Sequence, residues 1–109
     1  MTTPTTAAEL AATRKLIGLS AAELAGELSV NPASVRDWER GRFQPSEGLR
    51  RDIAALRARH DDALAAMIAD HDGEGRIIAL PDAPMPRSWY LALGARLIDH
   101  RPDAMLDWA

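Results

Sequence analysis

The side chains best suited to chemistry lie close together, shortly after Asn31 and Pro32. Arg36, Asp37 and Arg40 fall within a single short stretch of the chain. An arginine carries paired donors that fit a phosphate or the edge of guanine, and a carboxylate accepts a hydrogen bond from the amino group of cytosine. This combination is typical of a surface that reads a nucleic acid, and no catalytic apparatus accompanies it.

A first short helix is expected just before this stretch. Ser20 and Glu23 are spaced as a capping box, in which each side chain satisfies a free backbone N–H at a helix start. The helix should therefore begin at about Ala21. Its apolar positions Leu24 and Leu28, with small Ala25 beside them, form one stripe that can pack on a core. About three residues separate this helix from the next one.

A second short helix should carry the reactive side chains. Asn31 is a favoured N-cap, and Pro32 suits the first helical position because its missing N–H would be unpaired there. Val35 and Trp38 lie three apart on one face, so they are expected to anchor the helix in the core, and Gly41 should end it. A helix this short is stable only when docked. The opposite face then presents Ala33, Arg36, Asp37 and Arg40.

The stretch from about Glu9 to Ser46 resembles the DNA-binding domain of Cro/CI-type helix-turn-helix regulators, also called xenobiotic-response-element-like. The resemblance implies a lambda-repressor-like fold and a partly buried ion pair between Arg14 and Glu39. The matching residues are Arg14, Leu19, Ser20, Glu23, Leu24, Ala25, Leu28, Val30, Val35, Trp38, Glu39, Arg40, Gly41 and Pro45.

Two positions depart from the family pattern. Ala21 stands where the family usually has a Gln that contacts a DNA phosphate, and alanine has no side-chain donor for that contact. Ser29 stands where Gly is usual, in the turn between the two helices. A non-glycine residue with positive φ is uncommon, so mild backbone strain is expected at Ser29.

The resemblance and the residue chemistry together predict a set of DNA contacts. Base contacts are expected from Pro32 and Ala33 to thymine methyls, from Arg36 to guanine and from Asp37 to cytosine, while Ser34 suits a base or a phosphate. Phosphate contacts are expected from Ser20, Asn31, Arg40, Arg42 and Arg50.

Some of these residues have a plainer interpretation. Asp37 could instead pair with Arg36 or Arg40 on the surface. Arg50 and its neighbour Arg51 could be no more than the solvated start of a helix. Both interpretations stay open at the level of sequence.

Composition and charge agree with a small regulator. The 109 residues suffice for one domain, or for one small domain with an oligomerisation appendage. The net charge is −3, but residues 1–51 carry seven basic and six acidic side chains, whereas residues 52–109 carry six and ten. Residues 31–51 alone carry five arginines and three acids. The expected contact surface is therefore locally basic, which is what attracts phosphate.

The chain has no cysteine, which excludes a disulfide framework and thiolate chemistry. No apolar run approaches the ~20 residues that span a bilayer, and the N-terminus lacks the features of a signal peptide. A cytoplasmic location without membrane contact is expected.

Helices should also flank the central pair. Thr6 and Glu9 form another capping box for a first helix that ends at Gly18, and Ser46 can cap a long helix of about 47–71. Residues 72–75 break that helix, and 76–80 form an apolar run typical of one short strand. We expect a mainly α protein, with a DNA-binding domain at 6–71 and a C-terminal dimerisation region at 72–109.

The last helix is the main reason to expect a dimer. Ser88 could cap it, and its residues are apolar nearly all round, so one small domain would not cover every side. The tail after Arg101 is expected to add a further helical turn. A ligand pocket lined by Trp89 and Tyr90 is the alternative to a dimer core. The expected interface residues are Ile77, Trp89, Tyr90, Leu93, Leu97 and Trp108.

Function follows as a hypothesis: a homodimeric repressor that occludes a promoter at a palindromic operator, with half-sites one turn (about 34 Å) apart. Activation would use the same contacts. The order of elements is similar to that of anti-CRISPR-associated repressors. The alternative is an antitoxin that also binds a toxin protein through its C-terminal half.

An enzyme would have to use the histidine–acid pairs, and these do not form a metal site. The three pairs lie apart, without the close spacing of three or four ligands that zinc needs. We expect no enzyme activity, no metal and no cofactor. The pairs are His60–Asp61, His71–Asp72 and Asp99–His100.

Overall fold

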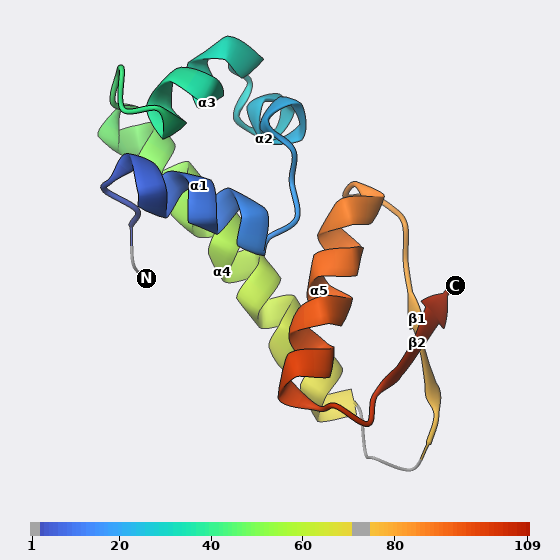
Figure 1. Ribbon diagram of the computed structural model, residues 1–109. Coiled ribbons are helices and arrows are strands. Elements are labelled where there is room, and N and C mark those ends of the chain that lie inside the picture. Colours follow the sequence, from blue (N-terminus) through green and yellow to red (C-terminus); the bar gives the residue numbers. More distant parts are fainter. Residues whose placement is uncertain (1–2, 71–74) are drawn as a thin grey trace.

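The computed structural model describes residues 3–70 and 75–109, which form an elongated, mainly helical molecule of 48 × 23 × 19 Å (Figure 1). The mainly α fold expected from the sequence is confirmed. In chain order the elements are α1 (Ala7–Leu16), α2 (Ala21–Leu28), α3 (Pro32–Glu39), α4 (Glu47–Asp70), β1 (Ile77–Leu80), α5 (Arg87–His100) and β2 (Met105–Trp108).

The helix starts lie where the capping residues predict them. The Ser20 hydroxyl accepts from the Glu23 amide at 3.0 Å, and the Glu23 carboxylate accepts from the Ser20 amide at 2.8 Å. Thr6 and Glu9 repeat this reciprocal pair at the start of α1. Asn31 Oδ1 accepts from the Ala33 amide at 2.8 Å. Each cap satisfies backbone donors that have no partner inside the helix.

Three turns set the angles between α1, α2, α3 and the segment that follows. Gly18 and Gly41 both have φ +77°, a conformation that glycine adopts without steric cost. Ser29 ends α2 at φ 57° and ψ 42°, so the positive φ expected there is confirmed. The turn from α2 to α3 is thus held left-handed by a serine, at some cost in backbone strain.

The long helix α4 connects the two ends of the molecule. The Ser46 hydroxyl accepts from the Leu49 amide at 3.2 Å, as a cap should, and the helix runs to Asp70. Its expected last residue, His71, lies outside the described residues. The helix-turn-helix packs along the first half of α4, and α5 packs along the second half (Figure 1).

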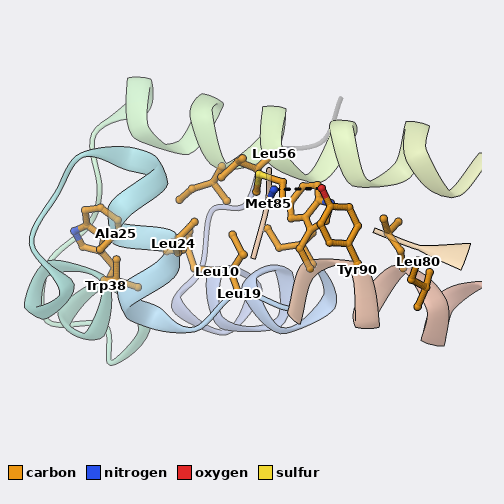
Figure 2. Close-up of a cluster of buried hydrophobic side chains, with 14 residues drawn as sticks. Leu10, Leu19, Leu24, Ala25, Trp38, Leu56, Leu80, Met85 and Tyr90 are labelled. Carbon is orange, nitrogen blue, oxygen red and sulfur yellow. Dashed lines mark hydrogen bonds between the residues drawn. The ribbon is translucent and has the colours of Figure 1, made fainter. Parts of the chain in front are cut away.

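One hydrophobic core runs through both halves (Figure 2). It extends from Trp38 and Leu24 in the helix-turn-helix, through Leu56 of α4, to Tyr90 and Leu80 near the C-terminus. The buried Tyr90 hydroxyl has a hydrogen-bond partner, because it accepts from the Met85 amide at 3.2 Å. Because the buried residues form one cluster, α5 is fixed relative to α2 and α3. The division into domains at residues 71 and 72 stays a prediction.

The C-terminal tail corrects the sequence expectation of one strand followed by a helical turn. Residues 105–108 form a second strand, parallel to β1, with Ile77 opposite Met105 and Leu80 opposite Trp108. Leu106 and Trp108 are half-buried while their neighbours are exposed, the period of two that belongs to a strand. The helix α5 is the crossover that parallel pairing requires.

The start of α5 also differs from expectation. The helix begins at Arg87 with Pro86 as its N-cap, and no side chain in residues 3–70 and 75–109 caps it. The Ser88 hydroxyl instead donates to the Glu23 carboxylate at 3.1 Å. Ser88 is thus used to join α5 to the start of α2, a partner 65 residues away that sequence spacing does not indicate.

Candidate nucleic-acid interface

The helix α3 is held in place by its inner face. Val35 is 1% exposed and Trp38 is 7% exposed, both within the core. The expectation that these two residues dock the helix is confirmed. An eight-residue helix has little stability of its own, so this docking is what makes its outer face a fixed surface.

A bidentate ion pair fixes the end of α3 to α1. Arg14 Nε and Nη2 donate to the two Glu39 carboxylate oxygens at 2.6 and 2.8 Å, and Nη1 donates to the Leu19 carbonyl at 3.0 Å. The hydrogen bond to Glu39 raises the pKa of Arg14, although burial acts in the opposite direction. The expected Arg14–Glu39 pair is confirmed. It ties α1, the α1–α2 turn and α3 into one unit.

The outer face of α3 presents the side chains expected to read bases. Ala33 and Arg36 are exposed, as is Arg40 just after the helix, while Pro32, Ser34 and Asp37 are half-buried. Within residues 3–70 and 75–109, Asp37 makes no ion pair with Arg36 or Arg40. The surface-pair alternative for Asp37 therefore has no support in this conformation, and its carboxylate is available to accept a hydrogen bond.

The residues expected to contact phosphates fall into two groups. Ser20 and Asn31 are exposed and cap helices through an acceptor oxygen, which leaves the Ser20 O–H and the Asn31 amide N–H groups as donors. Arg42 is fully at the surface. Arg50 is half-buried: Nη2 donates to Gln44 Oε1 at 2.8 Å, and Nε is buried without a hydrogen-bond partner among the described residues. Arg50 is thus less free than Arg42.

Sequence reasoning overlooked one residue beside this face. Phe43 is 67% exposed in the loop that follows α3, directly after Arg42. An aromatic ring at that exposure is unusual in a polar loop. Its position between two polar residues was the available signal, but a lone aromatic in a sequence more often belongs to the core.

The α1–α2 turn lies directly against α5. A Cβ at Gly18 would be 2.2 Å from the Ser88 carbonyl oxygen and 2.7 Å from the Ala92 Cβ, so only glycine permits this approach. The Glu23 carboxylate accepts hydrogen bonds from the Ser20 amide and from the Ser88 hydroxyl. The bond from the Ser20 amide has the largest effect on the pKa of Glu23, and together these bonds lower it although burial raises it. The helix-turn-helix is therefore fastened to α5 as well as to α4.

A buried histidine joins α4 to α5. His60 is 0% exposed, and its ring meets that of Trp89 edge to face at 4.5 Å. Arg96 Nη1 lies 2.8 Å from Nδ1, and since arginine only donates, Nδ1 accepts and Nε2–H donates to the Trp89 carbonyl at 3.1 Å. Burial, and then the nearby guanidinium of Arg96, lowers the pKa of His60.

Contacts within the chain occupy both His60 and Asp61, which argues against a metal site at this pair. The Asp61 carboxylate accepts from Arg96 at 2.7 Å and from Arg57 at 3.0 Å. Partial burial raises the pKa of Asp61, but the bonds to Arg96 and Arg57 together lower it below its ordinary value. Both residues are thus occupied by structural contacts. Among the described residues no three histidine or acidic side chains are placed to hold a metal ion.

Most of the expected dimer residues lie inside the chain's own core. Trp89, Tyr90, Leu93 and Leu97 are between 0 and 8% exposed, so the inference that a second subunit must cover them is wrong. The helix α4 and the two strands of the same chain cover that side of α5 (Figure 1). Ile77, at 65% exposure, and the half-buried Trp108 remain at the surface.

The alternative prediction was a ligand pocket lined by Trp89 and Tyr90, and only Tyr90 lines a cavity. Tyr90 lines a cavity of about 390 Å³ between α4, β1 and α5, whereas Trp89 packs on His60.

Docked short helices, a left-handed turn between them and an exposed basic outer face define a helix-turn-helix protein. Residues 10–55 match the family model described as helix-turn-helix, which spans α2 and α3 and the turn between them. This segment is a Cro/CI-type helix-turn-helix, and the match supports a DNA-binding transcription regulator.

No curated protein matches the chain. Among the helices of the described residues, none has the length and apolar character needed to cross a bilayer.

Proposed function

We propose that this protein is a homodimeric repressor that binds a palindromic operator and excludes polymerase from the promoter, in the cytoplasm. The observation that carries the proposal is the docking of α3. Val35, Trp38 and the Arg14–Glu39 pair hold the helix from behind, so that its outer face is fixed and open. A fixed helix of this width fits the major groove of DNA.

The base contacts would come from the start and middle of α3. Arg36 is long, exposed and free of an acid partner among the described residues, so it can donate both hydrogen bonds to guanine. Asp37 beside it would accept from cytosine. Pro32, Ala33 and Ser34 lie at the helix start, where the backbone comes nearest to the bases.

The phosphate contacts would come from residues around this face. Arg40 and Arg42 follow α3, while Ser20 and Asn31 sit at the starts of α2 and α3, where backbone N–H groups also favour an anion. Arg50 would join them by leaving Gln44. These contacts position the protein but carry no sequence information.

The experiment that tests the proposal is binding of an Arg36→Ala variant to the native promoter at fixed salt. Losing a bidentate base contact should weaken specific binding by about 1–3 kcal/mol, roughly five- to 150-fold, while binding to unrelated DNA changes little. Arg101→Ala is the matched control, because Arg101 directly follows α5, whose C-terminal end lies far from α3 (Figure 1). Unchanged promoter binding by Arg36→Ala would show that α3 does not read the operator.

A further inference from the structure

Exposed apolar side chains gather on the C-terminal part of the molecule. Of the five large apolar residues that are most exposed in the described ranges, Phe43 alone lies near the DNA-binding face. Leu91 is 54% exposed and Ile98 45% exposed, both on α5. With exposed Ala95 they stand at positions i, i+4 and i+7, so they form one continuous row, the α5 stripe.

The stripe borders an apolar groove between α5 and β2. Gly94 is buried there, and a Cβ on it would meet the Leu106 Cδ1 at 2.9 Å, so the strand packs tightly against the helix. Leu106 and Trp108 thereby continue the apolar surface beyond Ala95. Asp107 is the one charged residue among those lining this groove.

The outer edge of β2 is not the better surface for a partner. The Ala109 amide donates across the sheet to the Leu80 carbonyl, so the amide of the preceding residue, Trp108, points to the opposite edge. The Asp107 carboxylate accepts that Trp108 amide at 2.8 Å. This contact occupies a donor that an added strand would need. The helix stripe is therefore the open surface.

Opposite charges stand at the two ends of the stripe. Arg87 lies one turn before Leu91, with its guanidinium 3.8 Å from the centre of the Trp108 ring and without a carboxylate partner among the described residues. Asp99 follows Ile98, is exposed, and makes no ion pair in that same part of the chain. A stripe that is positive at one end and negative at the other is complementary to itself when two copies run antiparallel.

We propose that the α5 stripe is the surface that binds a second copy of this chain, with the two α5 helices crossing antiparallel near Ala95. Leu91 of one copy then packs against Ile98 of the other, and Arg87 reaches Asp99 of the other copy. Small Ala95 lets the helices approach closely at the crossing. The assignment rests on the proposed homodimer, and it replaces an interface built mostly from residues that are buried within one chain.

Cross-linking tests the crossing point without disturbing the core. Because the chain has no cysteine, an Ala95→Cys substitution introduces a single thiol on the exposed face of α5. Two such thiols near a two-fold axis can satisfy disulfide geometry, which needs Cα atoms within about 7 Å. Mild oxidation should convert most of this variant to a covalent dimer. Ala65→Cys, also at an exposed position but on α4, should remain mostly monomeric on a non-reducing gel.

Sedimentation provides the second measurement. Leu91→Asp should halve the sedimenting mass to that of one chain, 11.9 kDa, whereas Met105→Asp, an exposed apolar site on the outer sheet face, should leave the dimer intact. Arg87→Asp should weaken the dimer, and adding Asp99→Arg should restore it. Circular dichroism shows whether each variant is folded.

The outcomes separate the two proposals. If the wild-type chain is a dimer, but Ala95→Cys does not cross-link and Leu91→Asp still dimerises, the α5 stripe is not the interface, and operator binding by a dimer still stands. If the wild-type chain is a monomer at concentrations that saturate its DNA, both the stripe as a self-interface and the homodimer are wrong. The stripe would then belong to a different protein partner.

Discussion

His60 shows at the scale of one residue how a polar side chain becomes part of a core. An imidazole without charge can be buried if each nitrogen has a partner, and here Arg96 and the Trp89 carbonyl supply one each. Protonation would place a second donor against the guanidinium of Arg96, with no acceptor between them. The folded state therefore favours the neutral ring.

This arrangement predicts a loss of stability in mild acid. Burial lowers the pKa of His60 below the 6.5 of an unfolded chain, so the unfolded state takes up a proton first as the pH falls. The free energy of unfolding should decline below about pH 6.5, until the folded-state pKa is passed. Each unit of difference between the two pKa values costs about 1.4 kcal/mol.

Urea unfolding of the wild type and two variants between pH 7.5 and 5 checks the prediction. In His60→Gln the amide can replace both hydrogen bonds but does not titrate, so the decline should be smaller than in the wild type. His100→Gln, an exposed histidine at the end of α5, should leave the decline unchanged. Equal slopes for the wild type and His60→Gln would mean that His60 does not control acid stability.

At the scale of elements, the contact between the α1–α2 turn and α5 depends on a missing side chain. Gly18 has a positive φ and leaves no room for a Cβ beside the Ser88 carbonyl. Gly26, in the middle of α2, has open space around its Cα. Replacing each of these two glycines by alanine should therefore change the free energy of unfolding in opposite directions.

We predict that Gly18→Ala destabilises the protein by about 2–4 kcal/mol, from the positive φ and from overpacking against α5. Gly26→Ala should instead stabilise it by up to about 1 kcal/mol, because alanine is the better helix former. Urea midpoints of both variants measure the difference. A neutral Gly18→Ala would show that α5 does not pack on this turn in solution.

At the scale of the whole molecule, charge is distributed so that an acidic protein can still bind DNA. The net charge is −3, yet the arginines of residues 31–51 outnumber the acids, and the excess of acids lies in the second half of the chain. Only charges within about one Debye length of the phosphates, near 8 Å at physiological salt, attract them strongly. Local charge therefore decides binding.

Salt titration distinguishes local from global charge. Arg42→Ala should weaken binding to all DNA sequences alike and reduce the slope of log K against log salt concentration by about one, because one phosphate contact is lost. Arg101→Ala removes the same charge near the end of α5 and should leave the slope unchanged. If both variants shift the slope equally, the total charge controls binding and the assignment of Arg42 fails.

Local sequence patterns were enough to predict the helix-turn-helix. Spacing alone reveals capping pairs such as Ser20 and Glu23 and the N-cap Asn31, because these side chains act on backbone groups within a few residues. The left-handed Ser29 was predicted from the resemblance, since the family usually has glycine at that position. Val35 and Trp38 were predictable as core residues because a docked helix must bury one face. The Arg14–Glu39 pair came from the resemblance to Cro/CI-type regulators and is present.

The arrangement of α5, β1 and β2 beyond α4 became clear only from the tertiary structure. The sequence of an apolar helix does not say what covers it. In α5 the residues Trp89, Tyr90, Leu93 and Leu97 proved to be covered by their own chain, whereas Leu91 and Ile98 stay exposed. Pairing of β2 with β1, the bond from Ser88 to Glu23 and the partners of His60 all join residues far apart in sequence. Such contacts depend on how α5 lies on α4, which is set by packing and not by local spacing.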